Sequence, residues 1–163
     1  ERNAHGEFPS TPATAHFFGL KESLTMLNEE GLPAVFRRHA RLGEACRRAV
    51  RAMGLDLLAQ NPDHYSNTLT AVCLPEGFDS DAFVAHAQRS LEISLGIGLG
   101  KVKGKVFRIG HLGNLNELDL LGALAGIDMT LKSFGVPVPV GAGLTAAENY
   151  LLQTAPNIDT NAP

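Results

Sequence analysis

The chain has 163 residues, of which 44% are hydrophobic and 19% charged, and this length and composition are typical of a folded globular protein with a core of its own. Its 14 basic and 17 acidic residues give a formal net charge of −3, which argues against nucleic acid or an anionic membrane as a partner. Glycine, proline or charge interrupts every apolar stretch well before the roughly 18 residues of a membrane-spanning helix, and no export signal is recognisable, so we expect a cytoplasmic protein.

Two helices are predicted before the first strand. The first begins at Thr11, whose hydroxyl can cap free backbone N–H groups, with Pro12 at the first helical position, and it runs to about Glu30. Gly31 ends this helix and marks the expected boundary between two domains. The second helix covers 33–54. Its arginines are expected to form mostly a solvated face: Arg37, Arg38, Arg41, Arg47, Arg48 and Arg51.

The central part of the chain alternates short strands with one helix. Residues 55–58 could form a short strand, and residues 67–74 alternate in hydrophobicity and are rich in β-branched side chains. A helix capped by Asp79 follows, and then another short strand at 91–95. The last predicted strand covers 105–111.

The C-terminal part is predicted to be helical. Residues 114–117 resemble a capping box, and apolar residues at helical spacing continue the helix almost to Gly135. After an extended link at 136–139, a short helix is expected at 145–153. This order of elements suits an α+β fold, in which helices cover one face of a small, mainly antiparallel sheet and leave the other face free to dock on a second domain or a partner subunit.

The cysteines and histidines form no recognisable disulfide or metal motif. Cys46 and Cys73 lack a CxxC pattern, so we expect both to be reduced packing residues. The histidines contain no HExxH motif and no i,i+4 pair, so the sequence predicts no metal site. The chain begins without methionine in a polar segment, and we therefore expect it to be part of a longer protein.

The glycine-rich run GIGLGKVKG at 96–104 has two possible interpretations. Closely spaced glycines can let backbone N–H groups approach a phosphate, as they do in nucleotide-binding loops. Such a loop lies between a strand and a helix, whereas this run leads into the predicted strand at 105–111. The pattern therefore favours a hairpin-like turn over a nucleotide site.

Arg108 is the candidate binding residue that the pattern itself singles out. It lies between Phe107 and Ile109 in an apolar strand, where a guanidinium is costly unless it is paired. Its planar fork can bind a carboxylate through two parallel charge-assisted hydrogen bonds, so it could anchor an acidic small molecule. The alternative, which the residues alone slightly favour, is a salt bridge to an internal Asp or Glu. His111, at the end of the same strand, is expected only to make a local hydrogen bond.

The chain carries no recognisable catalytic set of its own. It has no GxSxG motif, no paired carboxylates at helical spacing beside a histidine, and no cysteine with an evident activating neighbour. On this local chemistry, we expect the chain to bind or position a substrate.

Four motifs of the sequence occur together in one family of enzymes. They are FRIGHLG at 107–113, GIGLGKVKGK before it, FPSTPATAHFFGLKESLTMLNEEGL at 8–32, and the stretch EEGLPAVFRRH at 29–39. From Phe8 to Leu152, the chain resembles the C-terminal portion of class V aminotransferases, which depend on pyridoxal 5′-phosphate, and within them the serine–glyoxylate and alanine–glyoxylate aminotransferase family.

The resemblance implies a fold and a set of functional residues. The fold would be the C-terminal domain of the aspartate-aminotransferase type (PLP fold type I), with residues 1–30 ending the large coenzyme-binding domain and 31–163 forming the small domain. Arg108 would bind the α-carboxylate of the amino-acid and keto-acid substrates. In a homodimer, Thr11 would contact the coenzyme phosphate bound to the other subunit, a role compatible with a helix N-terminus. The lysine that binds the coenzyme would belong to the upstream large domain, so this chain alone is expected to be inactive.

Three hypotheses for function follow. In the first, the intact protein transfers an amino group from an amino acid of the serine, aspartate or alanine class to glyoxylate, and this chain supplies the carboxylate-binding arginine and a phosphate contact. In the second, the chain is an isolated non-catalytic fragment that acts in dimerisation or substrate binding. In the third, the intact protein is a pyridoxal-phosphate lyase of the same fold type, because the residues that select the reaction would lie upstream.

Overall fold

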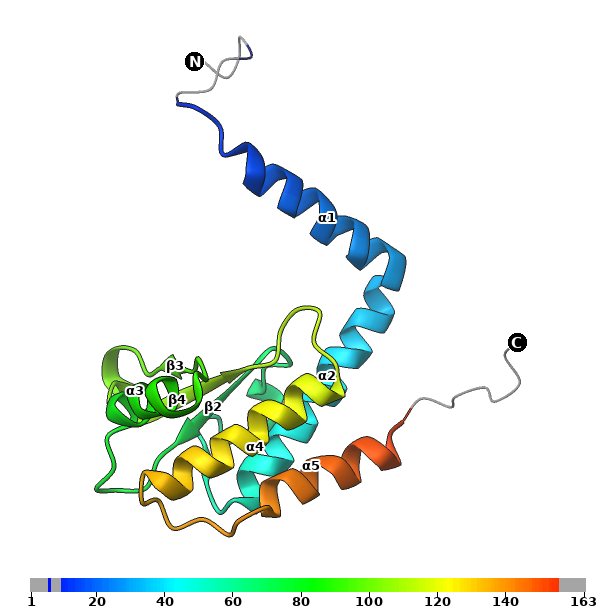
Figure 1. The fold of residues 1–163 in the computed structure, drawn as a ribbon. Helices are drawn as coiled ribbons and strands as arrows, with labels where there is room; N and C mark the ends of the chain where they lie inside the picture. Colours follow the sequence, from blue (N-terminus) through cyan, green and yellow to red (C-terminus); the bar gives the residue numbers. More distant parts are fainter. Residues whose placement is uncertain (1–5, 7–9, 156–163) are drawn as a thin grey trace. The chain divides into compact units, whose positions relative to one another are not determined.

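A computed structural model describes residue 6 and residues 10–155 of the chain, and Figure 1 shows its fold. The chain divides into two compact units, Glu1–Arg37 and Arg38–Pro163. Helix α1 belongs to the first unit, helix α2 begins in the first and continues into the second, and the strands of the described residues all belong to the second. The assignment of residues 1–30 and 31–163 to two domains of a larger protein stays a prediction.

Helix α1, Thr14–Glu30, begins later than the sequence predicts. Its N-cap is Ala13, and no side chain caps its first turn. Thr11 lies ahead of the helix, because the chain turns at Pro12, whose carbonyl accepts a hydrogen bond from the Thr14 N–H at 2.9 Å. The prediction that Thr11 is the N-cap, with Pro12 at the first helical position, is therefore wrong.

Helix α2, Leu32–Ala52, follows α1 almost directly and lies close to the predicted range of 33–54. Gly31 separates the two helices, with a φ of 79° that glycine adopts without strain. In the second unit, the apolar side of α2 is buried in the core. The buried residues include Leu42, Ala45, Cys46, Ala49 and Val50.

Among the described residues, four short strands form one antiparallel sheet with the order β1-β2-β4-β3. They are β1, Asp56–Leu57; β2, Leu69–Cys73; β3, Gly96–Ile97; and β4, Val106–Gly110. The two longest strands, β2 and β4, form the centre of the sheet. The small antiparallel sheet of the predicted α+β fold is therefore confirmed.

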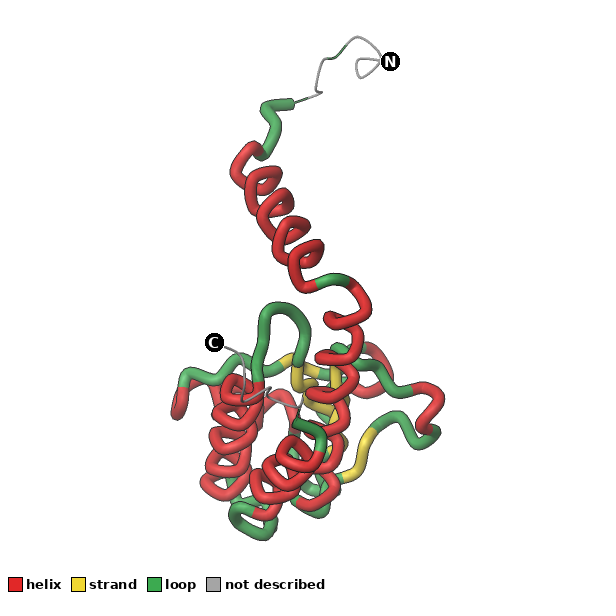
Figure 2. The backbone as a smooth tube through the Cα atoms, turned by 90° about the vertical axis from the view of Figure 1, so that its right-hand side faces the viewer, coloured by secondary structure: helices red, strands yellow, loops and turns green. Residues whose placement is uncertain are grey.

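Three further helices complete the second unit: α3, Ser80–Leu91; α4, Glu117–Ser133; and α5, Ala142–Gln153. Together with α2, they form a hydrophobic core against the residues of β2 and β4 that alternate inward. Helices α4 and α5 lie side by side, as both Figure 1 and Figure 2 show. The helices thus cover one face of the sheet, as the sequence predicts.

The N-terminal ends of α3 and α4 are capped in the predicted ways, by a single side chain in α3 and by a capping box in α4. Asp79 caps α3 by accepting a hydrogen bond from the Ala82 N–H at 2.8 Å. The capping box of α4 is present, but it joins Asn116 and Asp119 and therefore lies two residues after the predicted 114–117. The Asn116 side chain accepts the Asp119 N–H at 3.1 Å, and the Asp119 carboxylate accepts the Asn116 N–H at 2.9 Å.

The predicted strand at 91–95 is wrong. Helix α3 extends into this range and ends at Glu92, which adopts a left-handed conformation with a φ of 56°. Ile93 then packs against Gly126 of α4, where an added Cβ atom would meet the end of the Ile93 side chain. Strand pairing begins only at Gly96.

Candidate functional site

Arg108 lies in the middle of β4, on the face of the sheet away from the helical core. Its neighbours Phe107 and Ile109 are buried in that core, and because side chains alternate along a strand, Arg108 belongs to the opposite face. Its partners on the adjacent strands are Ala71 of β2 and Gly96 of β3. The arginine is therefore flanked by two small residues.

The guanidinium of Arg108 has no partner within the described part of the chain. The residue is half-buried, and its Nε atom is buried without a hydrogen-bond partner. The ion pairs found among residues 10–155 involve other arginines. The internal salt bridge that the sequence left open is thus absent there, and the guanidinium is available to an anion. That this anion is a substrate carboxylate stays a prediction.

The glycine-rich run at 96–104 forms the first strand and the turn of an antiparallel hairpin. It contains β3 and a 3-10 turn, η3, Gly100–Val102, and it leads into β4, with which β3 pairs. The hairpin-like interpretation is therefore confirmed. A phosphate-binding loop would instead open a helix, and no helix follows this run directly.

Thr11 belongs to the first unit and Arg108 to the second. The Thr11 side chain is exposed, and the first turn of α1 beside it has no side-chain cap. An exposed hydroxyl close to the positive end of a helix dipole suits a phosphate. The contact of Thr11 with a coenzyme phosphate stays a prediction.

The loop between β4 and α4 is held by two residues of α2 that the sequence reasoning did not single out. The buried His39 accepts a hydrogen bond from the Gly113 N–H through Nε2 at 3.1 Å. Arg38 donates from Nη1 to the carbonyls of Gly113, at 2.7 Å, and Leu115, at 3.0 Å. Two motifs that are distant in sequence, one ending at His39 and the other at Gly113, thus meet at the end of the strand that carries Arg108.

His111 fixes the same strand end from inside the core. Its Nδ1 lies 3.1 Å from the carbonyl of Asn67 and donates to it, so Nε2 accepts from the Thr70 hydroxyl at 2.9 Å. Burial lowers the pKa of His111, with a further contribution from nearby positive charge, and this favours the neutral form of the ring. A Cβ at Gly43 of α2 would lie 3.1 Å from the ring, and glycine leaves the space that His111 needs. His111 does make hydrogen bonds, but they are not local as expected, since its partners are 41 and 44 residues away in sequence, on and beside β2.

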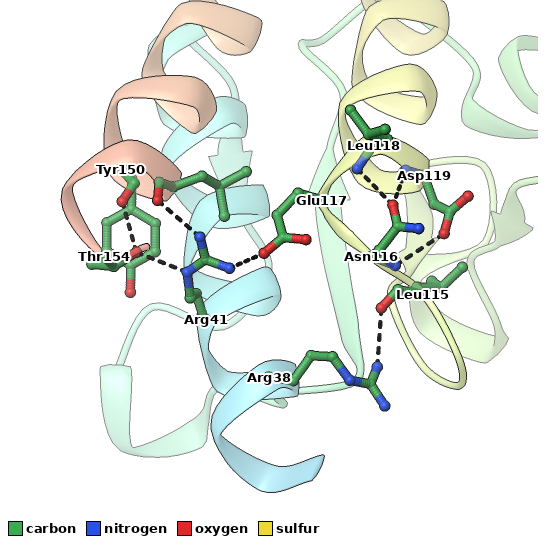
Figure 3. A network of polar contacts seen from close by, with 10 residues as sticks. Arg38, Arg41, Leu115, Asn116, Glu117, Leu118, Asp119, Tyr150 and Thr154 are labelled. Carbon is green, nitrogen blue, oxygen red and sulfur yellow. Dashed lines mark hydrogen bonds and ion pairs between the residues drawn. The ribbon is translucent and has the colours of Figure 1, made fainter. Parts of the chain in front are cut away.

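Arg41 joins three helices, as Figure 3 shows. From α2, it forms an ion pair with Glu117 at the start of α4. It also donates from Nη2 to the Leu151 carbonyl at 2.8 Å and from Nε to the Thr154 hydroxyl at 3.0 Å, both at the end of α5. The hydrogen bond from Arg41 lowers the pKa of Glu117. This cluster is structural, because its charges already have partners.

Arg47 is also engaged, and it is 6% exposed. It donates from Nε to Glu44 at 3.1 Å and from Nη1 to the Ser66 carbonyl at 3.0 Å, and its guanidinium lies 4.9 Å from the centre of the Tyr65 ring. Burial opposes ionisation of Glu44, but hydrogen bonds from Arg48 and Arg47 outweigh it and lower the pKa of Glu44. Some arginines of α2 do not lie on the expected solvated face, because they are buried or half-buried: Arg38, Arg41 and Arg47.

Cys46 and Cys73 are both free thiols, as expected. Burial raises the pKa of Cys46 to about 11, and burial also raises the pKa of Cys73, so neither is an activated thiolate.

Among the residues that the structure describes, no cluster of histidine, cysteine, aspartate or glutamate could hold a metal ion. None of the helices in that part of the chain has the length and apolar character needed to cross a membrane.

Named proteins match almost the whole chain. It is 50% identical over 151 residues to a serine–glyoxylate aminotransferase of Methylorubrum extorquens and, over the same length, to one of Arabidopsis thaliana. Each match covers 93% of this chain and 38% of the relative, in its C-terminal part. A solved structure of pyridoxamine–pyruvate aminotransferase from Mesorhizobium loti has a TM-score of 0.84 at 33% identity, over 91% of this chain and 38% of that one. No family model matches the chain.

Proposed function

We propose that the intact protein transfers an amino group from an amino acid to glyoxylate, because this chain belongs to the class V aminotransferases, of which it forms the C-terminal part. The observation that carries the proposal is the 50% identity, over 93% of the chain, to two serine–glyoxylate aminotransferases. Since the chain spans 38% of those relatives, the activity is assigned to the whole protein.

Arg108 supplies the contact that both substrates share. Serine and glyoxylate each carry a carboxylate next to the carbon that reacts, so one guanidinium can hold the donor in one half-reaction and the acceptor in the other. Its place on the face of the sheet away from the helical core, without a partner among the described residues, supports this role. Holding the carboxylate fixes the orientation of the reacting carbon, and small errors in that orientation cost much of the rate.

Pyridoxal 5′-phosphate is the coenzyme that this family implies, and it supplies an electron sink when it is bound. Thr11 fits its phosphate chemically, since it offers an exposed hydroxyl just ahead of α1, whose N-terminal end favours negative charge. We assign Thr11 to the phosphate bound by the other subunit of a homodimer. The upstream large domain would supply the remaining coenzyme contacts, and the assembled enzyme would be cytoplasmic.

Assay of the purified full-length protein tests the proposal. With serine and glyoxylate, it should form hydroxypyruvate and glycine in equal amounts, and aspartate and alanine in place of serine establish the preferred donor. Absence of glycine with every donor would contradict the proposal. Release of ammonia from serine without glyoxylate would indicate a lyase instead.

A further inference from the structure

Gly96 lies directly beside Arg108 across the β3–β4 pair. A Cβ atom built on Gly96 would be 2.9 Å from Arg108 Nε, 3.1 Å from Arg108 Cβ and 3.3 Å from Arg108 Cζ. The arginine side chain therefore passes closely over the backbone of Gly96. On this side of the strand, the absence of a side chain is what allows the guanidinium its present position.

The backbone of Gly96 does not itself require glycine. Nine glycines among the described residues have a positive φ, and Gly96 is not one of them. Alanine could adopt the same backbone conformation in an ordinary strand. The close approach of Arg108 is therefore the feature of this position that excludes a larger residue.

We propose that Gly96 is a positioning residue for the substrate carboxylate, acting through Arg108. This inference rests on the proposed function, in which Arg108 binds that carboxylate. A methyl group at position 96 would displace the guanidinium, because the far end of the arginine side chain moves more easily than the two paired strands. A guanidinium displaced by about 1 Å would bind and orient both carboxylate substrates less well.

A double-mutant cycle in the full-length protein separates this role from a general structural one. Gly96→Ala should lower kcat/KM for serine and for glyoxylate by about tenfold or more, through an increase in KM for both. In an Arg108→Ala background, the same substitution should have little further effect, because the group it displaces is gone. An equal loss of kcat/KM in both backgrounds would overturn the role of Gly96.

Gly110 provides the matched control. It lies on the same strand as Arg108, it is exposed, and a Cβ there would meet nothing within 4 Å. Gly110→Ala should leave both KM values within about twofold of the wild type, since it adds a methyl group in open space. A loss as large as that of Gly96→Ala would show that any added methyl group on this sheet is harmful, and would overturn the proposal.

Thermal unfolding supplies a readout that does not depend on activity. Gly96→Ala should lower the melting temperature more with Arg108 present than with alanine at position 108, because only the first combination contains the clash. If Gly96→Ala alone fails to fold, the double variant should fold. Failure of the double variant as well, or an equal fall in melting temperature in both backgrounds, overturns the proposal. An inactive wild-type protein would instead defeat the proposed function, while this cycle would still test the clash.

Discussion

On the helical side of the second unit, the charges of Arg41 and Arg47 are matched by carboxylates and carbonyls, whereas Arg108, on the other face of the same sheet, has no partner among the described residues. The engaged arginines connect helices and loops. Arg108 is flanked by small residues that leave its guanidinium free for a ligand. Arginine thus stabilises the fold on the helical side of the sheet and, we propose, binds the substrate on the other face.

Removing Arg108 should give the largest effect, and it should fall on activity. Arg108→Ala in the full-length protein should lower kcat/KM for serine and glyoxylate by about a hundredfold or more, because a bidentate charge-assisted contact is lost. Arg108→Lys should recover little of this, since an ammonium lacks the planar fork. Steady-state kinetics measure the loss of activity, and the melting temperature shows whether stability is lost as well.

Arg89 is the control for this prediction, because it lies exposed on α3. Arg89→Ala should change neither kcat/KM nor the melting temperature appreciably. A large loss of stability in Arg108→Ala, with KM unchanged, would place Arg108 among the structural arginines and remove the contrast between the two faces.

His111 should give the largest effect on stability. His111→Ala leaves the Thr70 hydroxyl and the Asn67 carbonyl without their partner and opens a cavity, so the free energy of unfolding should fall by about 2–4 kcal/mol. Chemical denaturation measures the change, with His64→Ala at an exposed position as the control. Equal stabilities of the two variants would show that the buried hydrogen bonds contribute nothing net.

Arg41 should matter less, because its surroundings are partly open to water. Arg41→Ala removes contacts to Glu117, Leu151 and Thr154, and we expect a loss of about 1–2 kcal/mol in the free energy of unfolding. Arg48, whose side chain is 48% exposed, should give a smaller change on replacement by alanine. A larger loss for Arg48→Ala would reverse the expected order.

Acidification should give the smallest effects, in two separate ranges. The pKa of His111 is lowered in the folded protein, so its contribution is complete above the ordinary histidine pKa of about 6.5 and is lost as the pH falls through its lowered value. The pKa of Glu117 is also lowered, and its contribution disappears at more acidic pH, below the ordinary glutamate pKa of about 4.3. Unfolding measured against pH should lose the first dependence in His111→Ala and the second in Glu117→Gln. Unchanged profiles in these variants would contradict the assignment.

Local signals in the sequence predicted the elements that depend on neighbouring residues. Asp79 capped the helix that it was expected to cap, and the apolar residues on either side of Arg108 placed it on a strand. The strand expected at 91–95 failed because Glu92 closes α3 in a left-handed conformation, which its residue type does not indicate. At the start of α1, Thr11 had the right residue type for a cap, but the helix begins after the turn at Pro12.

The sequence could not predict the partners of the arginines. Arg41 contacts residues more than a hundred positions away, and Arg38 binds carbonyls of a loop that follows β4. Such pairs follow from tertiary packing, to which the spacing of charges along one helix gives no guide. The same holds for Gly96, which the sequence placed in a hairpin-like turn without showing that its strand pairs with that of Arg108.

The single guanidinium of Arg41 also affects how the end of α5 can move. Fraying of the last turn is normally the easiest motion of a terminal helix, because few bonds oppose it. Here the closing carbonyl at Leu151 and the hydroxyl at Thr154 are both held from α2 by a side chain that also binds Glu117. Opening of the last turn of α5 therefore has to break two hydrogen bonds to a side chain that Glu117 of α4 also holds, so fraying there costs more than at an unsupported helix end.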